Sequence, residues 1–192
     1  MRQGAPQMAV EQKRMTYNEF EQFIAAPEND ARRFELVDGQ LVEADTSQLR
    51  GRLCARVAGL IYSFDKQASL GRYAVKCYHK MPDDDYNALR PDVSFTSHAR
   101  TEPINKEGPV QHMPDLAVEI KGWDTSIIGM RNRAAYYIAN GARMVWLVYT
   151  DKQIIEIYQP GVDLQILIDG DTIDGGDVLP GFTLPVREVF DI

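Results

Sequence analysis

Apolar residues follow two different patterns along this chain, short runs and helical spacing. The two patterns separate predicted strands from predicted helices. Residues 115–121 and 143–150 are short apolar runs between loop signals, which is typical of buried strands. Between them, residues 126–140 follow a helical pattern that stops at Gly141. A strand, a helix and a strand in this order predict a right-handed crossover, so we expect the two strands to be parallel neighbours.

The N-terminal third predicts a short helix, a hairpin and a longer helix. Thr16 and Glu19 fit a capping box for a helix over residues 17–25. Asp38 and Gly39 fit the two-residue turn of a hairpin over residues 33–43. Residues 47–69 then carry an apolar stripe at helical spacing, made of Leu49, Leu53, Val57, Leu60 and Phe64.

The other segments predict strands joined by polar loops. We expect strands at residues 72–80, 89–96, 153–158 and 163–168, and loop at residues 169–177. Residues 97–114 are long and polar for a connection, which favours a binding loop or a lid. The length indicates a single α/β domain over residues 15–192, preceded by a flexible tail of residues 1–14.

Polar residues in two of these strands point to a metal site. Glu119 and Lys121 alternate with apolar residues and share one face of their strand, and Asp92 opens the polar face of the preceding strand. If the strands are neighbours, two carboxylates and an ammonium lie close together. Binding of a divalent cation and activation of a water molecule require such a group of side chains. The ordinary alternative is an exposed ion pair worth roughly 0–1 kcal/mol. The apolar character of the Glu119 strand favours the metal site.

Composition and charge narrow the possible partners. The chain is 44% hydrophobic and 26% charged, as in ordinary globular proteins, and lacks a membrane-length apolar run or signal peptide, so we expect a cytoplasmic protein with no membrane partner. Cys54 and Cys77 are expected to be reduced thiols. The net charge of −7 means that nucleic acid would need a local basic patch or a metal. Arg52 and Arg56, one helical turn apart, could contact phosphate, or could simply lie on a solvated helix edge.

Short motifs in a fixed order then resemble a known family. Pro91-Asp92 and Glu119-Ile120-Lys121 match the PD-(D/E)XK signature of restriction-endonuclease-like proteins. With the motifs around Phe34–Leu41, Arg90–Phe95, Val145–Val148 and Leu179–Leu184, the chain resembles the Uma-type family of that superfamily from residue 15 to residue 190.

The resemblance implies a central mixed sheet flanked by helices and a metal-dependent endonuclease that hydrolyses DNA. It implies that Asp92, Glu119 and the main-chain carbonyl of Ile120 hold Mg²⁺, with Mn²⁺ as a substitute. Lys121 would act on the attacking water, and Glu35 is often counted with the site. A non-catalytic binding or assembly protein with the same fold, and a hydrolase of another phosphate ester, remain alternatives.

The chain departs from the family pattern at three places, and the first is Gly122-Trp-Asp124 in place of a Ser-Pro run after the Glu119 strand. Arg133 aligns where many members have a helical lysine; it stays protonated and could hold phosphate but not act as a base. The histidine that the family has near the start of the long helix is absent from this chain, which has Leu49 and Arg50 in that neighbourhood. We further predict a symmetric homodimer, because it is the commonest closed oligomer.

Overall fold

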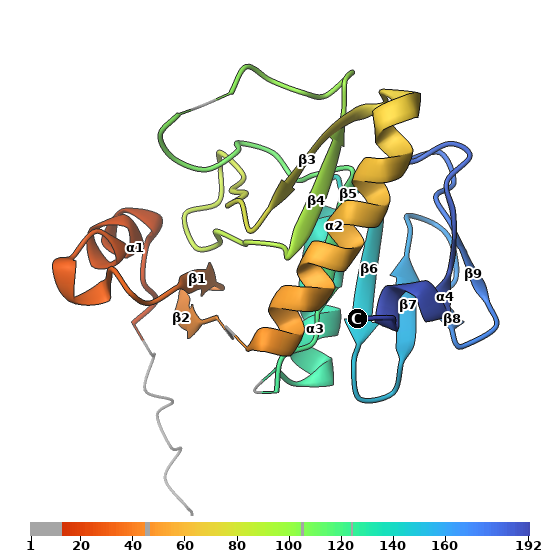
Figure 1. Ribbon diagram of the computed structural model, residues 1–192. Coiled ribbons are helices and arrows are strands. Elements are labelled where there is room, and N and C mark those ends of the chain that lie inside the picture. The colour runs from red at the N-terminus through yellow and green to blue at the C-terminus, as the bar shows by residue number, and fades with distance from the viewer. Residues whose placement is uncertain (1–12, 45–46, 105, 124) are drawn as a thin grey trace, which may run out of the picture.

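A six-stranded sheet forms the centre of the computed structural model, which describes residues 13–44, 47–104, 106–123 and 125–192 (Figure 1). The strand order is β3-β4-β5-β6-β7-β8. β5 and β6 pair in parallel, and every other neighbouring pair is antiparallel. The predicted parallel pair is therefore confirmed. The strands are β3 (Gly71–Val75), β4 (Val93–Ser97), β5 (Leu116–Ile120), β6 (Met144–Tyr149), β7 (Ile154–Tyr158) and β8 (Gln165–Leu167).

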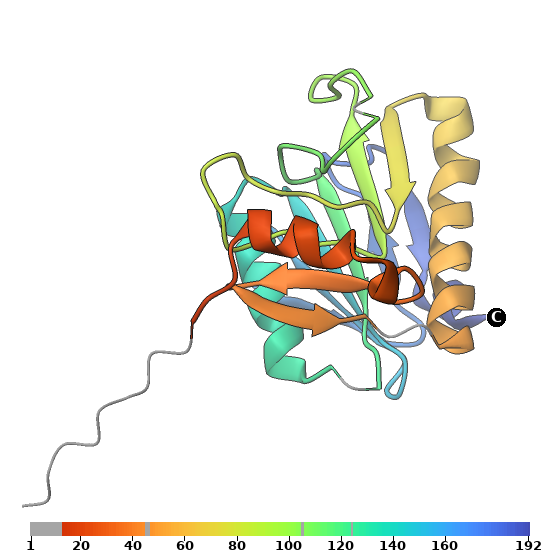
Figure 2. The same ribbon diagram turned by 90° about the vertical axis from the view of Figure 1, so that its left-hand side faces the viewer.

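Two long helices cover opposite faces of this sheet. α2 (Gln48–Ala68) lies over one face and α3 (Ile127–Ala139) over the other (Figures 1 and 2). All six residues of β6 are buried, because each face of the strand packs into a different core. Trp146 belongs to the core under α2, and Val145 and Leu147 belong to the core under α3. The predicted mixed sheet flanked by helices is confirmed.

The N-terminal segment forms a separate small unit beside the sheet (Figure 2). It consists of α1 (Tyr17–Ile24), the 3-10 turn η1 (Pro27–Asn29), and a hairpin of β1 (Phe34–Val37) and β2 (Gln40–Glu43). The capping box of Thr16 and Glu19 is present, and Asp38 and Gly39 form the hairpin turn with positive φ, as predicted. Most of the predicted tail lies outside the described residues. At its end, Arg14 pairs with Asp38 and covers the ring of Tyr86.

The C-terminal segment contains elements that the sequence pattern did not predict. β9 (Thr172–Asp174) pairs with β10 (Thr183–Pro185), and α4 (Val186–Phe190) follows. They pack with α2 through Ile173, Leu184 and Val189. The loop predicted for residues 169–177 is thus wrong at its centre. A three-residue strand with a single buried side chain is too short to show a period of two.

Three predicted strands are shorter than expected, and the reasons lie in the backbone. β3 ends at Val75 because Lys76 adopts a left-handed conformation with φ of 53°. Before β4, Leu89 pairs only with His79 in an isolated bridge, so Asp92 lies just outside the strand. β8 covers residues 165–167 rather than 163–168.

The buried face of α2 also differs from the predicted stripe. Leu49 is 48% exposed, whereas Arg50, Cys54 and Ile61 are buried beside Leu53 and Val57. Both cysteines are free thiols, as predicted. Within the described residues, no helix combines the length and the apolar character that crossing a membrane requires.

Candidate active site

Asp92 is the centre of a buried ionic cluster at one end of the sheet. Its carboxylate is fully buried and accepts hydrogen bonds from Nε and Nη2 of Arg50, at 3.0 and 2.9 Å. The ammonium of Lys76 bonds to the same carboxylate, and the main-chain N–H of Ile120 donates to it at 2.7 Å. The last bond ties the start of β4 to the end of β5, so the position of Asp92 is fixed by backbone as well as by charge.

Glu119 comes from β5 and is 1% exposed. Its carboxylate accepts a hydrogen bond from the hydroxyl of Tyr137 at 2.9 Å. Two guanidinium groups approach it, Arg133 at 3.6 Å and Arg50 at 3.9 Å. Burial raises the pKa of the Glu119 carboxyl to about 7; the nearby arginines oppose this rise, while the charges of Glu35 and Asp92 add to it.

Glu35 completes the cluster from the hairpin. Its carboxylate pairs with Nη2 of Arg133 at 2.7 Å and accepts the main-chain N–H of Arg90 at 2.7 Å. Arg133 therefore lies between Glu35 and Glu119, just as Arg50 lies between Asp92 and Glu119. The three acids therefore lie close together, since Arg50 is shared by Asp92 and Glu119, and Arg133 is shared by Glu119 and Glu35.

Lys121 does not occupy the position that we predicted for it. Its ammonium lies 3.5 Å from the carbonyl oxygen of Gly122 and, among the described residues, makes no ion pair with an acid. Arg50 and Arg133 bridge the acids instead, and Lys76 pairs with Asp92 alone. The reason is that these three cations already reach the buried carboxylates from α2, from the end of β3 and from α3.

The three arginines proposed as phosphate ligands have different surroundings. Arg52 lies on the exposed side of α2. Arg56 donates to the carbonyl oxygen of Glu188 at 2.8 Å, so it attaches α2 to the C-terminal helix rather than facing the acids. Only Arg133 lies among the acids, with a side chain that is 11% exposed.

Sequence reasoning missed Arg50, Lys76 and Tyr137 as members of the cluster. A usable signal existed for Arg50, because it stands three and four residues before Leu53 and Cys54 and so falls on the buried side of its helix. Tyr137 carries the same signal on α3, four residues after Arg133. Lys76 carries none, because its approach to Asp92 depends on the left-handed turn after β3.

A cleft of about 420 Å³ opens onto these residues between the hairpin and α3. Glu35, Arg50, Glu119 and Arg133 line it. The first turns of α3 form one wall, and the hairpin contributes Asp38 and Glu43. A small polar ligand or a single phosphate group can therefore reach Glu119 from this side.

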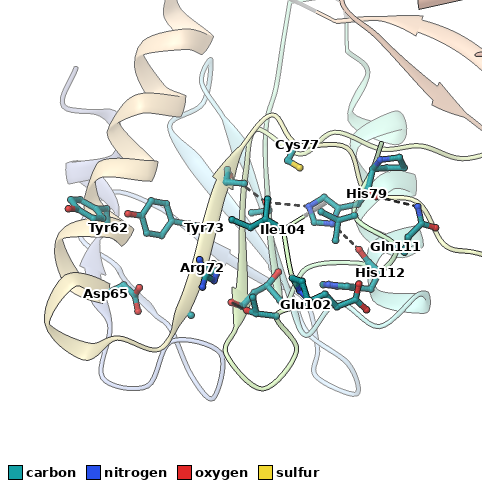
Figure 3. A pocket seen from close by; sticks show the side chains of 18 of the residues that line it. Tyr62, Asp65, Arg72, Tyr73, Cys77, His79, Glu102, Ile104, Gln111 and His112 are labelled. Atoms are coloured by element: carbon teal, nitrogen blue, oxygen red, sulfur yellow. Dashed lines mark hydrogen bonds between the residues drawn. The ribbon is translucent and has the colours of Figure 1, made fainter. Parts of the chain in front are cut away.

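A larger cavity of about 720 Å³ lies along β3, and none of the three acids lines it (Figure 3). Tyr62 and Tyr73 meet edge to face at one end, and His79 and His112 lie at the other (Figure 3). Burial lowers the pKa of His79 to about 4, so this ring is neutral at neutral pH. Residues of the polar connection 97–114 line this cavity, so the predicted binding loop borders the large cavity rather than the cleft.

The donor set of the cluster is compatible with a magnesium ion. Among the described residues, no group of three or more His, Cys, Asp or Glu side chains is arranged to hold a metal. Magnesium, however, is commonly held by one or two carboxylates together with water and substrate phosphate. Asp92 and Glu119 supply two hard oxygen ligands that already converge on one cationic group, the guanidinium of Arg50. Arg50 thus stands where a shared cation would be held.

Comparisons with known proteins identify the family and the fold of the chain. The model of the Uma2 family, described as "Putative restriction endonuclease", matches residues 18–187. Among solved structures, the chain is similar to a crystal structure described as a putative nuclease belonging to DUF820 from Anabaena variabilis, with a TM-score of 0.77 and 18% identity. That match covers 92% of this chain and 97% of the other. The search of curated proteins found no match.

Proposed function

Because the chain belongs to the Uma2 family of putative restriction endonucleases, we propose that it is a magnesium-dependent endonuclease that hydrolyses phosphodiester bonds of DNA. The observation that carries the proposal is the convergence of Asp92 and Glu119 on the guanidinium of Arg50, at 2.9 and 3.9 Å. Two buried carboxylates that share one cation are the arrangement from which a metal-dependent hydrolase is built.

The residues of the cluster have separate roles in this proposal. Asp92, Glu119 and the main-chain carbonyl of Ile120 would hold Mg²⁺ or Mn²⁺. The ion would stabilise charge on the phosphoryl oxygens and lower the pKa of a water molecule. Arg50 must release at least one carboxylate for the ion to bind, and its guanidinium is then free to hold a phosphate oxygen.

Three other residues orient a carboxylate or act on the attacking water. Tyr137 and Arg133 fix the orientation of Glu119 through a hydrogen bond and an ion pair. Arg133 stays protonated and serves as an anchor rather than as a base. Lys121 follows directly after β5 and is assigned to the attacking water, which requires its ammonium to leave the carbonyl oxygen of Gly122.

A second function is favoured by one specific observation. The carboxylates of Asp92, Glu119 and Glu35 are balanced in number by the cations of Arg50, Arg133 and Lys76. A cluster balanced in this way also suits a binding or assembly protein that keeps the fold of a nuclease but does not cut.

Metal-induced melting shifts and DNA cleavage, measured on the same protein, separate the two functions. Mg²⁺ or Mn²⁺ should raise the melting temperature of the wild type, because a ligand that binds only the folded state stabilises it. Asp92→Asn and Glu119→Gln should lose both the shift and cleavage. Lys121→Ala should keep the shift and lose turnover, since the group acts on water rather than on the ion.

Glu156→Gln is the matched control. Glu156 is equally buried, but it pairs with Arg131 and two tyrosines away from the cluster, so this variant should keep both properties. If Glu119→Gln cuts DNA as fast as the wild type, the site is wrongly assigned. If the wild type neither responds to metal nor cuts, the binding protein is the correct reading.

A further inference from the structure

The most exposed tryptophan of the chain lies beside the cleft. Trp123 is 82% exposed, four residues after Glu119. It is two residues from Thr125, which lines the cleft, so the two Cα atoms are at most about 7 Å apart. Ile128, the second residue of α3, is 73% exposed. Because this exposed ring lies beside the cleft, its face is available to stack on a ligand that enters there.

The shape of the cleft restricts which form of DNA can reach the acids. Glu119 lines the cleft of about 420 Å³ and is 1% exposed, and Asp92, which is 0% exposed, does not line it. A duplex carries its phosphates on a wide, rigid surface and cannot lower one of them to a carboxylate as buried as that of Glu119. A single strand is thin and flexible enough to do so.

The charges around the cleft restrict how such a strand can be held. Arg50 and Arg133 provide positive charge near the base, but the hairpin side carries Asp38 and Glu43. The whole chain has a net charge of −7. An extended series of phosphate contacts is therefore unfavourable, and most of the affinity must come from contacts with bases.

We propose that Trp123 stacks on a base of single-stranded DNA, next to the nucleotide whose phosphate enters the cleft. The inference rests on the proposed function for the identity of the ligand. It goes beyond that function in naming the substrate class and the residue that selects it. Stacking on an aromatic ring tolerates any base, so the same contact predicts little sequence preference.

The chain offers an optical test that does not depend on cleavage. It has two tryptophans, and Trp146 is fully buried in the core under α2. Quenching of tryptophan fluorescence by DNA therefore reports on Trp123. The titration is done with a short oligothymidylate in EDTA, so that no metal-dependent cleavage occurs, and labelled oligonucleotide provides an independent anisotropy measurement of Kd.

The wild type should show quenching with oligothymidylate and little with a duplex of the same length. Trp123→Ala should raise the Kd for the single strand by about 5- to 150-fold, because stacking contributes about 1–3 kcal/mol per base. Trp123→Phe should keep most of the affinity. Ile104→Ala is the control, since Ile104 is 77% exposed but borders the large cavity instead of the cleft.

The possible results distinguish failure of this inference from failure of the proposed endonuclease activity. An unchanged Kd in Trp123→Ala, absence of binding to the single strand, or equal Trp123-dependent binding to duplex overturns the inference. Quenching and Trp123-dependent binding, together with no cleavage in Mg²⁺, support this binding site while rejecting the proposed endonuclease activity.

Discussion

At the scale of single residues, the site is organised by arginines on the buried sides of two helices. Arg50 lies on the core side of α2, and Arg133 lies between Met130 and Tyr137 on the core side of α3. A buried guanidinium is strongly destabilising unless a carboxylate accompanies it. Each arginine is therefore bound to two acids, and the arginines and acids fix one another in place.

Removing one of these arginines should destabilise the fold in a pH-dependent way. Arg133→Met leaves Glu35 and Glu119 buried without their shared cation, at a cost of about 3–5 kcal/mol near neutral pH. Loss of the cation raises the folded-state pKa of the Glu119 carboxyl further, so the folded state then binds more protons than the unfolded state. Stability should consequently fall as pH rises from about 5 to 8, as measured by urea denaturation.

The double variant Arg133→Met/Glu35→Gln is the matched comparison. Glutamine keeps an acceptor for the main-chain N–H of Arg90 but removes one of the stranded charges. The double variant should be more stable than Arg133→Met alone. Strictly additive losses would show that Glu35 and Arg133 are not energetically coupled.

The acids of the site could be predicted from the sequence, whereas their partners could not. Asp92 and Glu119 belong to a recognisable motif and lie in or beside apolar strands, so their proximity follows from strand pairing. Arg50 and Lys76 reach Asp92 from α2 and from the turn after β3, and these contacts depend on tertiary packing. Lys121 was misplaced because strand alternation gives the side of a residue but not the direction of a long side chain beyond the strand end.

At the scale of elements, the existence of strands and helices was predictable and their ends were not. β5, α3 and β6 are long enough for their periods to be read directly from the sequence. The ends of β3 and β4 depend on residues outside the strands, such as Lys76, whose backbone is left-handed. β9 and β10 share a core with α2. Contacts between such distant segments cannot be read from a local sequence pattern.

The first residue of β3 should tolerate no side chain. A Cβ on Gly71 would lie 2.7 Å from Cζ of Phe95 and would also collide with the carbonyl oxygen of Thr96. Gly71→Ala should therefore destabilise the protein by about 1–3 kcal/mol, through displacement of β4. Thermal and chemical denaturation would measure the loss.

Gly59 on α2, in contrast, should tolerate a side chain. It is exposed, and a Cβ there would meet no atom within 4 Å. Gly59→Ala should stabilise the protein by up to about 1 kcal/mol, because alanine favours the helix. If both alanine variants change stability equally, the close approach of β3 and β4 is not the cause.

At the scale of the whole molecule, one edge of the central sheet is apolar and uncovered. β8 is the last strand in the order, and Ile166 within it and Leu164 and Ile168 directly beside it are 51%, 42% and 55% exposed. An edge of this kind favours pairing with another strand, and the same edge on a second copy is self-complementary. The homodimer predicted from the sequence is therefore expected to form through β8.

Light scattering should give twice the mass of the chain for the wild type in the micromolar range. Ile166→Lys should give the monomer with an unchanged far-ultraviolet spectrum, because a charge on an edge strand opposes pairing. Tyr62→Lys alters an equally exposed apolar residue on α2 and should leave the dimer intact. A monomeric wild type would refute the prediction.

The separate core of the N-terminal unit would allow one wall of the cleft to unfold on its own. Phe20, Phe34, Leu36 and Ala88 form a small cluster that is distinct from the two cores of the central sheet. The hairpin forms its own two-stranded sheet and meets α3 through the ion pair of Glu35 with Arg133. We expect this unit to open as one cooperative foldon, with faster amide exchange than β5 and β6. The free energy of this local opening would then set the fraction of molecules whose cleft admits more than a single phosphate group.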